Sequence, residues 1–202
     1  MDIEYVKCPI CEANNTEKSA FKLNDDINYL DNIYKFYECP NCGRFVYCDK
    51  IDNNIDKDKY SSYLYYKTVD IKTEDYKNNK LSKFYNFIGS KSDYKKVVAE
   101  NNWSANLTND VVNSWYPTKF NEKVDKFLLL LSIKSRYMGE ELKFDDNEIL
   151  IACFCLKSNL NLFRTKDDLF RQAKDFLNYL EEKKYIKYYN NYIKLPLKVG
   201  KE

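Results

Sequence analysis

The chain has 202 residues with only 4 Gly and 4 Pro, so it is long enough for one large domain or roughly two to three small ones and is not a low-complexity chain. Its net charge of +2 predicts no polyanion partner by itself, but residues 1–60 hold 8 Lys/Arg against 12 Asp/Glu, whereas residues 183–202 hold 6 Lys against 1 Glu. The absence of His excludes Ser-His-Asp and Cys-His catalysis and His-ligated zinc.

The first residues of the chain do not resemble a signal peptide, because the run from Met1 to Lys7 lacks an apolar stretch. The longest apolar run, from Phe127 to Leu131, is too short to span a bilayer. We therefore expect a cytoplasmic protein with no membrane partner. In that compartment thiols stay reduced, and paired cysteines bind metal more often than they form disulfides.

Two matched cysteine pairs stand near the N-terminus, CPIC at 8–11 and CPNC at 39–42, and Gly43 follows the second pair. Two intervening residues let both thiolates of a pair reach one ion, and a glycine at positive φ lets backbone N–H groups face the sulfurs. Four thiolates fill a tetrahedral shell and leave no position for water or substrate. We predict a structural Zn²⁺ site formed by Cys8, Cys11, Cys39 and Cys42.

The spacer between the two pairs contains two apolar segments, at 21–23 and 33–37, that favour strands around a polar turn, as in a zinc ribbon. The alternatives are four unrelated thiols or a redox cysteine pair. The matched spacing argues against the first. No βαβ pattern is evident around either pair, which argues against a thioredoxin-like site. Cys153 and Cys155 are predicted to be small, buried core residues. Cys48 is predicted to be a small, half-buried residue, with a spare thiol near the metal as the alternative.

The middle of the chain begins with a polar stretch at 49–60, the exit from a ribbon that we place at residues 1–58. Residues 59–116 are predicted to be a mixed, mostly helical connecting segment. Residues 63–66 favour a strand or a short buried helix, residues 81–88 a helix that ends at Gly89, and residues 93–99 another helical turn. Trp103 and Trp115 are interpreted as packing anchors, with a stacking surface for bases as the alternative.

The C-terminal part, residues 117–202, shows a regular succession of elements. A helix begins at Pro117-Thr118 and ends at Gly139, and its apolar face comprises Phe120, Val124, Phe127, Leu128, Leu131 and Tyr137. A short strand at 142–144 precedes a second helix, which is capped by Asp146 and runs through the apolar stretch 149–156.

A third helix is capped by Thr165, with Asp168 in the acidic capping-box position. It is followed by a hairpin at 185–195 whose turn is Asn190-Asn191, a pair that tolerates positive φ. Helix, strand, helix, helix and hairpin is the order of a winged helix. We therefore predict an α+β protein with a small zinc ribbon, a helical middle segment and a C-terminal winged-helix-like domain.

Winged helices often bind DNA through the third helix in the major groove and through phosphate contacts from the wing. The candidate nucleic-acid contacts are Lys166, Arg171 and Lys174 on the third helix, with Lys187 and Lys194 on the hairpin. Against this, the same helix presents Asp167, Asp175 and Glu182 outward. A winged helix that serves as a protein-interaction module is the alternative.

The runs WYPTKFNEKVDKFLLL at 115–130 and SRYMGE at 135–140 resemble a segment of a loose group of bacterial proteins. Those proteins carry a CPxC…CPxCG ribbon and a winged-helix-like region. Many continue into a nucleotide-processing domain of the TIR or nucleoside-deoxyribosyltransferase type, in a defence-related setting. This sequence departs from them by stopping at Glu202, just after the wing, so no such activity carries over. The resemblance implies the recognition region of a longer effector, or a stand-alone regulator or phage inhibitor that binds a host complex.

The predicted function is a non-catalytic, zinc-binding recognition protein. Nucleic-acid-binding regulation is the first hypothesis. A protein-interaction or sensing module of a bacterial or phage defence or anti-defence system, which binds a protein complex or a nucleotide signal, is the second. Catalysis is disfavoured because the sequence has no Gly-rich phosphate loop, metal-carboxylate motif or nucleophile elbow. The acidic pairs at 145–146 and 167–168 are explained as helix N-terminal charges.

Overall fold

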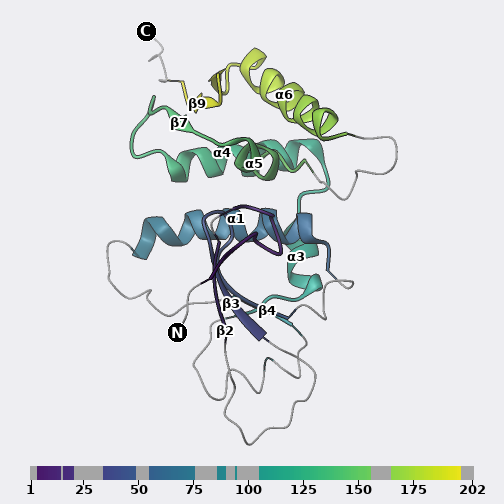
Figure 1. The fold of residues 1–202 in the computed structure, drawn as a ribbon. Coiled ribbons are helices and arrows are strands. Elements are labelled where there is room, and N and C mark those ends of the chain that lie inside the picture. The colour runs from purple at the N-terminus through teal and green to yellow at the C-terminus, as the bar shows by residue number, and fades with distance from the viewer. Residues whose placement is uncertain are drawn as a thin grey trace, which may run out of the picture.

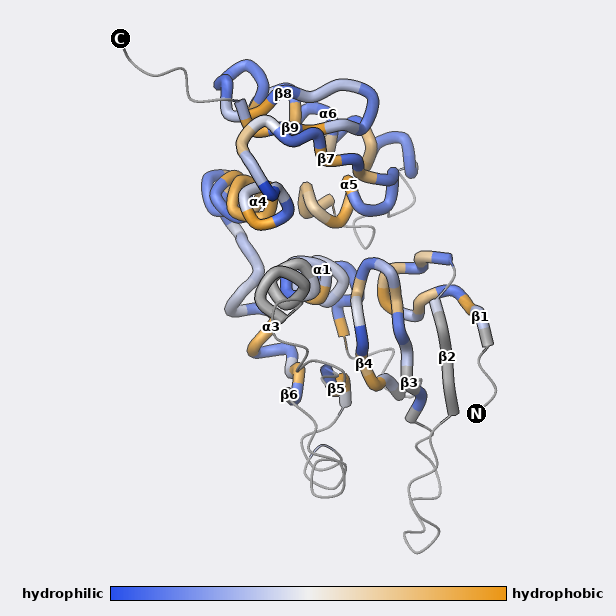
Figure 2. The backbone as a smooth tube through the Cα atoms, turned by 90° about the vertical axis from the view of Figure 1, so that its left-hand side faces the viewer, coloured by the Kyte–Doolittle hydropathy of each residue, from blue (hydrophilic) through white to orange (hydrophobic). Residues whose placement is uncertain are grey.

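The computed structural model describes residues 4–14, 16–20, 34–48, 55–75, 86–89, 94, 105–155 and 165–196. The chain is mixed α+β, as the sequence predicts. Its elements form three layers, with a sheet from the N-terminal half at one end, helix α1 in the middle, and the C-terminal helices with a second small sheet at the other end (Figures 1 and 2).

The first sheet has six strands in the order β1-β2-β3-β4-β5-β6. The strands β1 to β4 pair antiparallel, whereas β5 and β6 join the edge of β4 in parallel. The strand expected at 33–37 is observed from Tyr34 onward, and the one expected at 21–23 lies outside the described residues. The bounds are β1 Glu4–Val6, β2 Thr16–Ala20, β3 Tyr34–Cys39, β4 Gly43–Cys48, β5 Asn86–Ile88 and β6 Ala105–Asn106.

Helix α1, Lys57–Asp75, connects the parallel strands β4 and β5 and thereby forms a βαβ unit. The sequence-based expectation that no βαβ pattern follows the cysteine pairs was wrong. The periodicity did not predict this helix, because it has no single apolar stripe. Its buried side chains lie on several sides of the helix and include two serines: Tyr60, Ser61, Ser62, Leu64, Tyr65 and Tyr66. Residues 63–66 are therefore the interior of a long helix, not a strand or a short helix.

The helix expected over 81–88 was also wrong at its end, because Asn86–Ile88 is a strand that pairs in parallel with β4. Phe87 and Ile88 are fully buried. Three residues are too few for a two-residue periodicity to be visible, so the i, i+3, i+4, i+7 spacing dominated the pattern. Residues 81–85 lie outside the described part of the chain, as do residues 93–99 apart from Tyr94.

The C-terminal elements follow the predicted order of helix, strand, helix, helix and hairpin. The second sheet has the order β7-β9-β8 and is antiparallel throughout. A further short helix, α3, precedes this part of the chain. The bounds are α3 Asn109–Trp115, α4 Phe120–Lys134, β7 Leu142–Lys143, α5 Asp146–Ala152, α6 Lys166–Glu182, β8 Lys187–Tyr189 and β9 Tyr192–Lys194.

The predicted start of the third helix and the predicted hairpin turn are both confirmed. Thr165 Oγ1 accepts from the Asp168 amide at 3.3 Å, and Asp168 Oδ2 accepts from the Thr165 amide at 2.8 Å, which confirms the capping box of α6. Asn190 and Asn191 have φ of 46° and 65°, which confirms the two-residue turn.

The ends of the first two helices differ from the prediction. Asp145, not Asp146, caps α5, and its Oδ1 accepts from the Glu148 amide at 2.7 Å. Because α5 ends at Ala152, Cys153 is its C-cap and Cys155 lies beyond it. Helix α4 ends at Lys134, before Gly139, so Tyr137 is 65 % exposed instead of lying on a buried helical face.

Helix α1 lies between the first sheet and the C-terminal helices, because it contacts β4 and also α4 and α5. Its hydroxyl groups satisfy carbonyls at the end of α5, where a helix leaves acceptors without intrahelical donors. Ser62 Oγ donates to the Ile151 carbonyl at 3.3 Å, and the Tyr66 hydroxyl donates to the Ala152 carbonyl at 2.8 Å. Buried residues from all three predicted regions form one continuous core. The division at 58 and 116 stays a prediction.

Among the helices that the structure describes, none combines the length and the apolar character needed to cross a membrane.

Candidate metal centre

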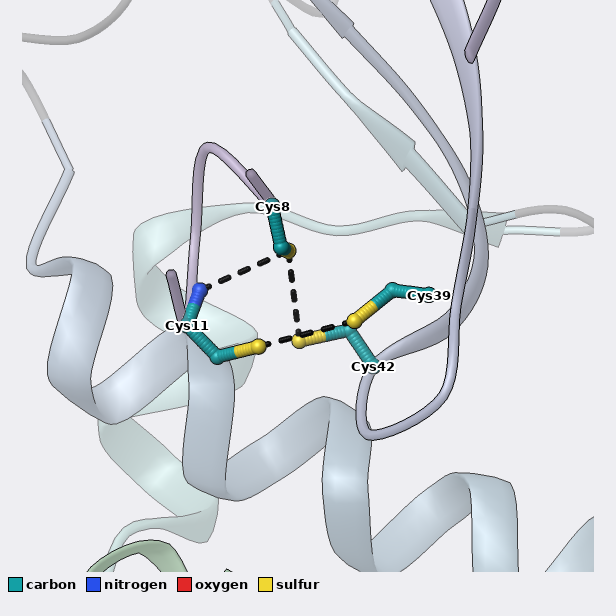
Figure 3. A group of neighbouring side chains, drawn as sticks. All are labelled: Cys8, Cys11, Cys39 and Cys42. Atoms are coloured by element: carbon teal, nitrogen blue, oxygen red, sulfur yellow. Dashed lines mark hydrogen bonds between the residues drawn. The ribbon is translucent and has the colours of Figure 1, made fainter. Parts of the chain in front are cut away.

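The two cysteine pairs come from neighbouring turns at one end of the first sheet. Cys8 and Cys11 lie on the turn that follows β1, whereas Cys39 ends β3 and Cys42 directly precedes β4. The antiparallel pairing of β1 with β2 and of β2 with β3 places the first turn beside the second. Figure 3 shows the four side chains pointing toward one another.

The four sulfurs have the spacing of a tetrahedral thiolate shell. All lie within 4.8 Å of one another, with Cys8 Sγ to Cys42 Sγ at 4.0 Å and Cys11 Sγ to Cys39 Sγ at 3.5 Å. A zinc ion with Zn–S bonds of about 2.3 Å requires sulfurs about 3.8 Å apart. All four residues are buried. The group can therefore hold a metal ion, and its donor set and spacing fit zinc.

The backbone of both turns has the shape that the sulfurs require. Gly43 has φ of +66°, as expected from the sequence, and a Cβ there would lie 2.5 Å from Thr68 Oγ1 of α1. Glu12 occupies the matching position after the first pair, with φ of +61°, which the sequence did not reveal because Glu rarely adopts this conformation. In the first turn the Cys11 amide donates to Cys8 Sγ at 3.5 Å.

Burial and the neighbouring thiols shift the pKa values of the cysteines in different directions. Hydrogen bonding from Cys11, the largest cause, lowers the pKa of Cys39 below its usual value, while burial raises the pKa of Cys42 well above it. Four thiolates in one buried group would repel one another strongly, so the group needs a cation to ionise completely. A bound divalent ion supplies that charge, and its binding releases thiol protons.

The first cysteine turn is tied to the C-terminal elements by side-chain amides. Asn147 Nδ2 on α5 donates to the Cys11 carbonyl at 3.2 Å. One residue earlier, Asp146 Oδ1 accepts from Asn191 Nδ2 in the hairpin turn at 3.0 Å. The first turn of α5 therefore connects the metal centre with the β8–β9 hairpin. No local pattern in the sequence indicates these long-range contacts.

A cluster beside this link joins three elements. The Tyr65 hydroxyl donates to Glu148 Oε1 at 3.0 Å, and Lys134 Nζ lies 2.8 Å from the same hydroxyl and 3.3 Å from Glu148 Oε1. Burial, followed by the charge of Glu148, raises the pKa of Tyr65 far above its usual value, so this hydroxyl stays protonated and available as a donor.

Cys153 and Cys155 lie outside the metal group. Cys153 is fully buried and Cys155 half-buried, and burial raises the pKa of Cys155 to about 11. Cys153 is therefore a core residue, as predicted, whereas Cys155 is only partly buried and packs against the core. Cys48 is the last residue of β4, and its side chain lies outside the described part of the structure.

The five predicted nucleic-acid contacts divide between two surfaces. Lys166, Arg171 and Lys174 are exposed on α6, where Arg171 pairs with Asp168. Lys187 is exposed on β8, whereas Lys194 on β9 pairs with Glu141 at 3.1 Å.

Trp115 is half-buried and packs edge-on against Tyr63 and Tyr66 of α1, at ring-centroid distances of 5.2 Å and 5.3 Å. The Lys126 ammonium lies 4.3 Å from its ring centroid. This position agrees with a packing anchor and leaves little ring surface for a base. Trp103 lies outside the described residues.

No family model matches the chain, and no curated protein and no solved structure matches it either.

Proposed function

We propose that this chain is a non-catalytic, zinc-stabilised recognition protein that binds nucleic acid through a C-terminal winged helix. The pairing of β7 with β9, and of β9 with β8, is the strand order that a winged helix has, and it supports this assignment. The zinc-ribbon assignment of residues 1–58 is supported by the two cysteine turns at one end of antiparallel strands.

The distribution of charge around the hairpin carries the proposal. Lys183, Lys184 and Lys187 are all exposed, and residues 183–202 contain 6 Lys against 1 Glu. Helix α6 is different, because its sequence KDDLFRQAKDFLNYLEE has more acidic than basic side chains. A helix of this kind is poorly suited to a phosphate-lined groove. We therefore assign the phosphate contacts to the hairpin and its preceding turn instead of to α6.

The test measures binding of the zinc-loaded chain to labelled duplex and single-stranded DNA of random sequence. The readout is fluorescence anisotropy over a series of salt concentrations. Binding should weaken steeply as salt rises, because lysines displace counterions from phosphates. The double variant Lys183→Glu/Lys184→Glu should bind at least about ten-fold more weakly. Lys119→Glu, an exposed lysine at the start of α4, is the matched control. If neither probe binds at low salt, the proposal is wrong.

A second function, a protein-interaction or sensing module of a bacterial or phage defence system, is favoured by one observation. Phe120 and Tyr179 are 50 % and 37 % exposed, and their rings meet at 4.9 Å on the surface where α4 and α6 join. Exposed aromatic residues are enriched at protein interfaces. This function predicts a stoichiometric complex with a partner protein that forms unchanged when Lys187→Glu and Lys194→Glu are introduced.

A further inference from the structure

The second sheet has two chemically different faces, which follow from its register. Leu142 pairs with Ile193, and Ile193 pairs with Tyr188, so these three residues share the face toward the helices. Successive side chains of a strand point to opposite faces. The outward face therefore consists of Lys143, Lys187, Tyr189, Tyr192 and Lys194.

The two tyrosines on the outward face form a flat pair. Tyr189 and Tyr192 are direct cross-strand partners, and their rings stack with centroids 5.8 Å apart and an interplanar angle of 19°. Tyr189 is 43 % exposed. Packing of the sheet does not require this pair, because the core side is filled by Leu142 and Ile193, which are 9 % and 0 % exposed.

Lysines surround the ring pair. Lys143 Nζ lies 6.0 Å from the Tyr192 ring centroid, and Lys187 and Lys194 are direct partners at the far end of the same face. The neighbouring carboxylate of Glu141 pairs with Lys194 at 3.1 Å, and its proximity raises the pKa of the Tyr189 hydroxyl above its usual value. Lys143 and Lys187 are exposed on the same face.

Stacked aromatic rings on a sheet, flanked by ammonium groups, match the chemistry of an unpaired nucleotide strand. Bases stack on the rings whatever their sequence, and lysines neutralise the adjoining phosphates. A duplex hides the faces of its bases inside its own stack, so it can engage the lysines but not the rings. An acidic peptide can also pair with the lysines, but it gains little from the ring faces.

We propose that the outward face of the β7-β9-β8 sheet binds single-stranded nucleic acid, with about two bases stacked at Tyr189 and Tyr192. The adjoining phosphates lie at Lys143 and Lys187. This inference rests on the proposed nucleic-acid function and names its substrate class and contact residues.

The experiment uses the full zinc-loaded chain, a labelled oligothymidylate of about ten nucleotides, and a blunt hairpin duplex of similar charge. Tyr189→Ala and Tyr192→Ala should each weaken single-strand binding about ten-fold or more, and duplex binding less than about two-fold. The control Tyr189→Phe keeps the ring and loses only the hydroxyl, so its single-strand affinity should stay within about two-fold of wild type. Lys143→Ala and Lys187→Ala should each reduce the salt slope for the single strand by about 0.7.

The outcomes separate this inference from the function on which it rests. Circular dichroism and zinc content must first show that each variant is folded. If both probes bind but the alanine variants bind the single strand as wild type does, the inference is overturned while the proposed function stands. Equal losses on duplex and single strand overturn the substrate class. Polyglutamate serves as an acidic-peptide probe. If the alanine variants lose binding to polyglutamate but keep binding to oligothymidylate, this face is a protein site and the inference is overturned. If neither probe binds wild-type protein, both proposals fail.

Discussion

The N-terminal sheet and the C-terminal helical region are stabilised by different kinds of interaction. The cysteine group joins turns that are far apart in sequence, and β2 pairs with β3 although residues 21–33 separate them. The C-terminal region is organised by local devices, such as the α6 capping box and the Asn190-Asn191 turn. We therefore expect the first region to depend on a bound ion and on long-range pairing, whereas several elements of the second region are also fixed by interactions within a few residues.

Helix α1 connects the two regions, so a change in the stability of one region can affect the other. It contacts β4 of the first region and α4 and α5 of the second. A perturbation of the metal centre should therefore stay in the first region only if α1 keeps its contacts with α5. Substitutions in the metal group, in α1 and at the Asn147 contact test this in turn.

The largest effect is expected from Cys39→Ser, which removes one ligand from the metal group. Structural zinc contributes on the order of 10 kcal/mol to folding, so residues 4–48 should lose their protected structure while α4, α5 and α6 remain folded. Zinc content should fall from about one ion per chain to none. Metal analysis and limited proteolysis measure both results.

Cys155→Ser is the matched control, because Cys155 is half-buried and lies outside the metal group. It should keep its zinc and its proteolytic pattern. Unchanged zinc content and unchanged N-terminal proteolysis in Cys39→Ser would contradict the metal site itself. Proteolysis throughout α4 to α6 would instead show that the two regions fold as one unit.

A smaller effect, shared by both regions, is expected from Leu64→Ala in α1. Leu64 has 0 % exposure, and removing a fully buried leucine side chain costs about 2–5 kcal/mol. Denaturant unfolding should shift for the zinc-dependent signal and for helical circular dichroism together, because α1 packs on both regions. Leu129→Ala, at a position 58 % exposed on α4, should change stability by less than about 0.5 kcal/mol. If only one signal moves in Leu64→Ala, α1 does not couple the regions.

The smallest effect is expected from Asn147→Ala, which removes the hydrogen bond to the Cys11 carbonyl. The loss should be about 1 kcal/mol, with zinc still bound. Hydrogen exchange should become faster in the first cysteine turn and in β9, because Asp146 beside it holds the hairpin turn. Asn121→Ala, an exposed asparagine on α4, is the control. Unchanged exchange in both segments would show that this contact transmits nothing between the regions.

Local sequence patterns predicted the elements that local interactions stabilise. The capping box, the Asn-Asn turn and the apolar stripe of α6 are each completed within a few residues, so their patterns could be recognised without the tertiary structure. The error at α5 was one residue, because Asp145 and Asp146 are both suitable caps. The matched spacing of the cysteine pairs likewise indicated that the four thiols lie together, whereas the bound metal and its identity stay predictions.

The βαβ unit and the metal-to-hairpin link could not be predicted in this way. Helix α1 is buried on several sides and therefore lacks the stripe that marks a surface helix. Strand β5 has three residues, and its identity is decided by pairing with β4. Glu12 at positive φ is tolerated because the cysteine turn around it imposes that conformation.

The sequence by itself indicated the four candidate metal ligands and determined the α+β class and the order of the C-terminal elements, because each depends on residue type and short spacing. Only the tertiary structure decided which residues meet across the chain. It placed Asn147 against the Cys11 carbonyl and Gly43 against Thr68, and it brought Tyr189 and Tyr192 onto one exposed face with three lysines. Register and packing set these contacts, and both depend on the whole fold.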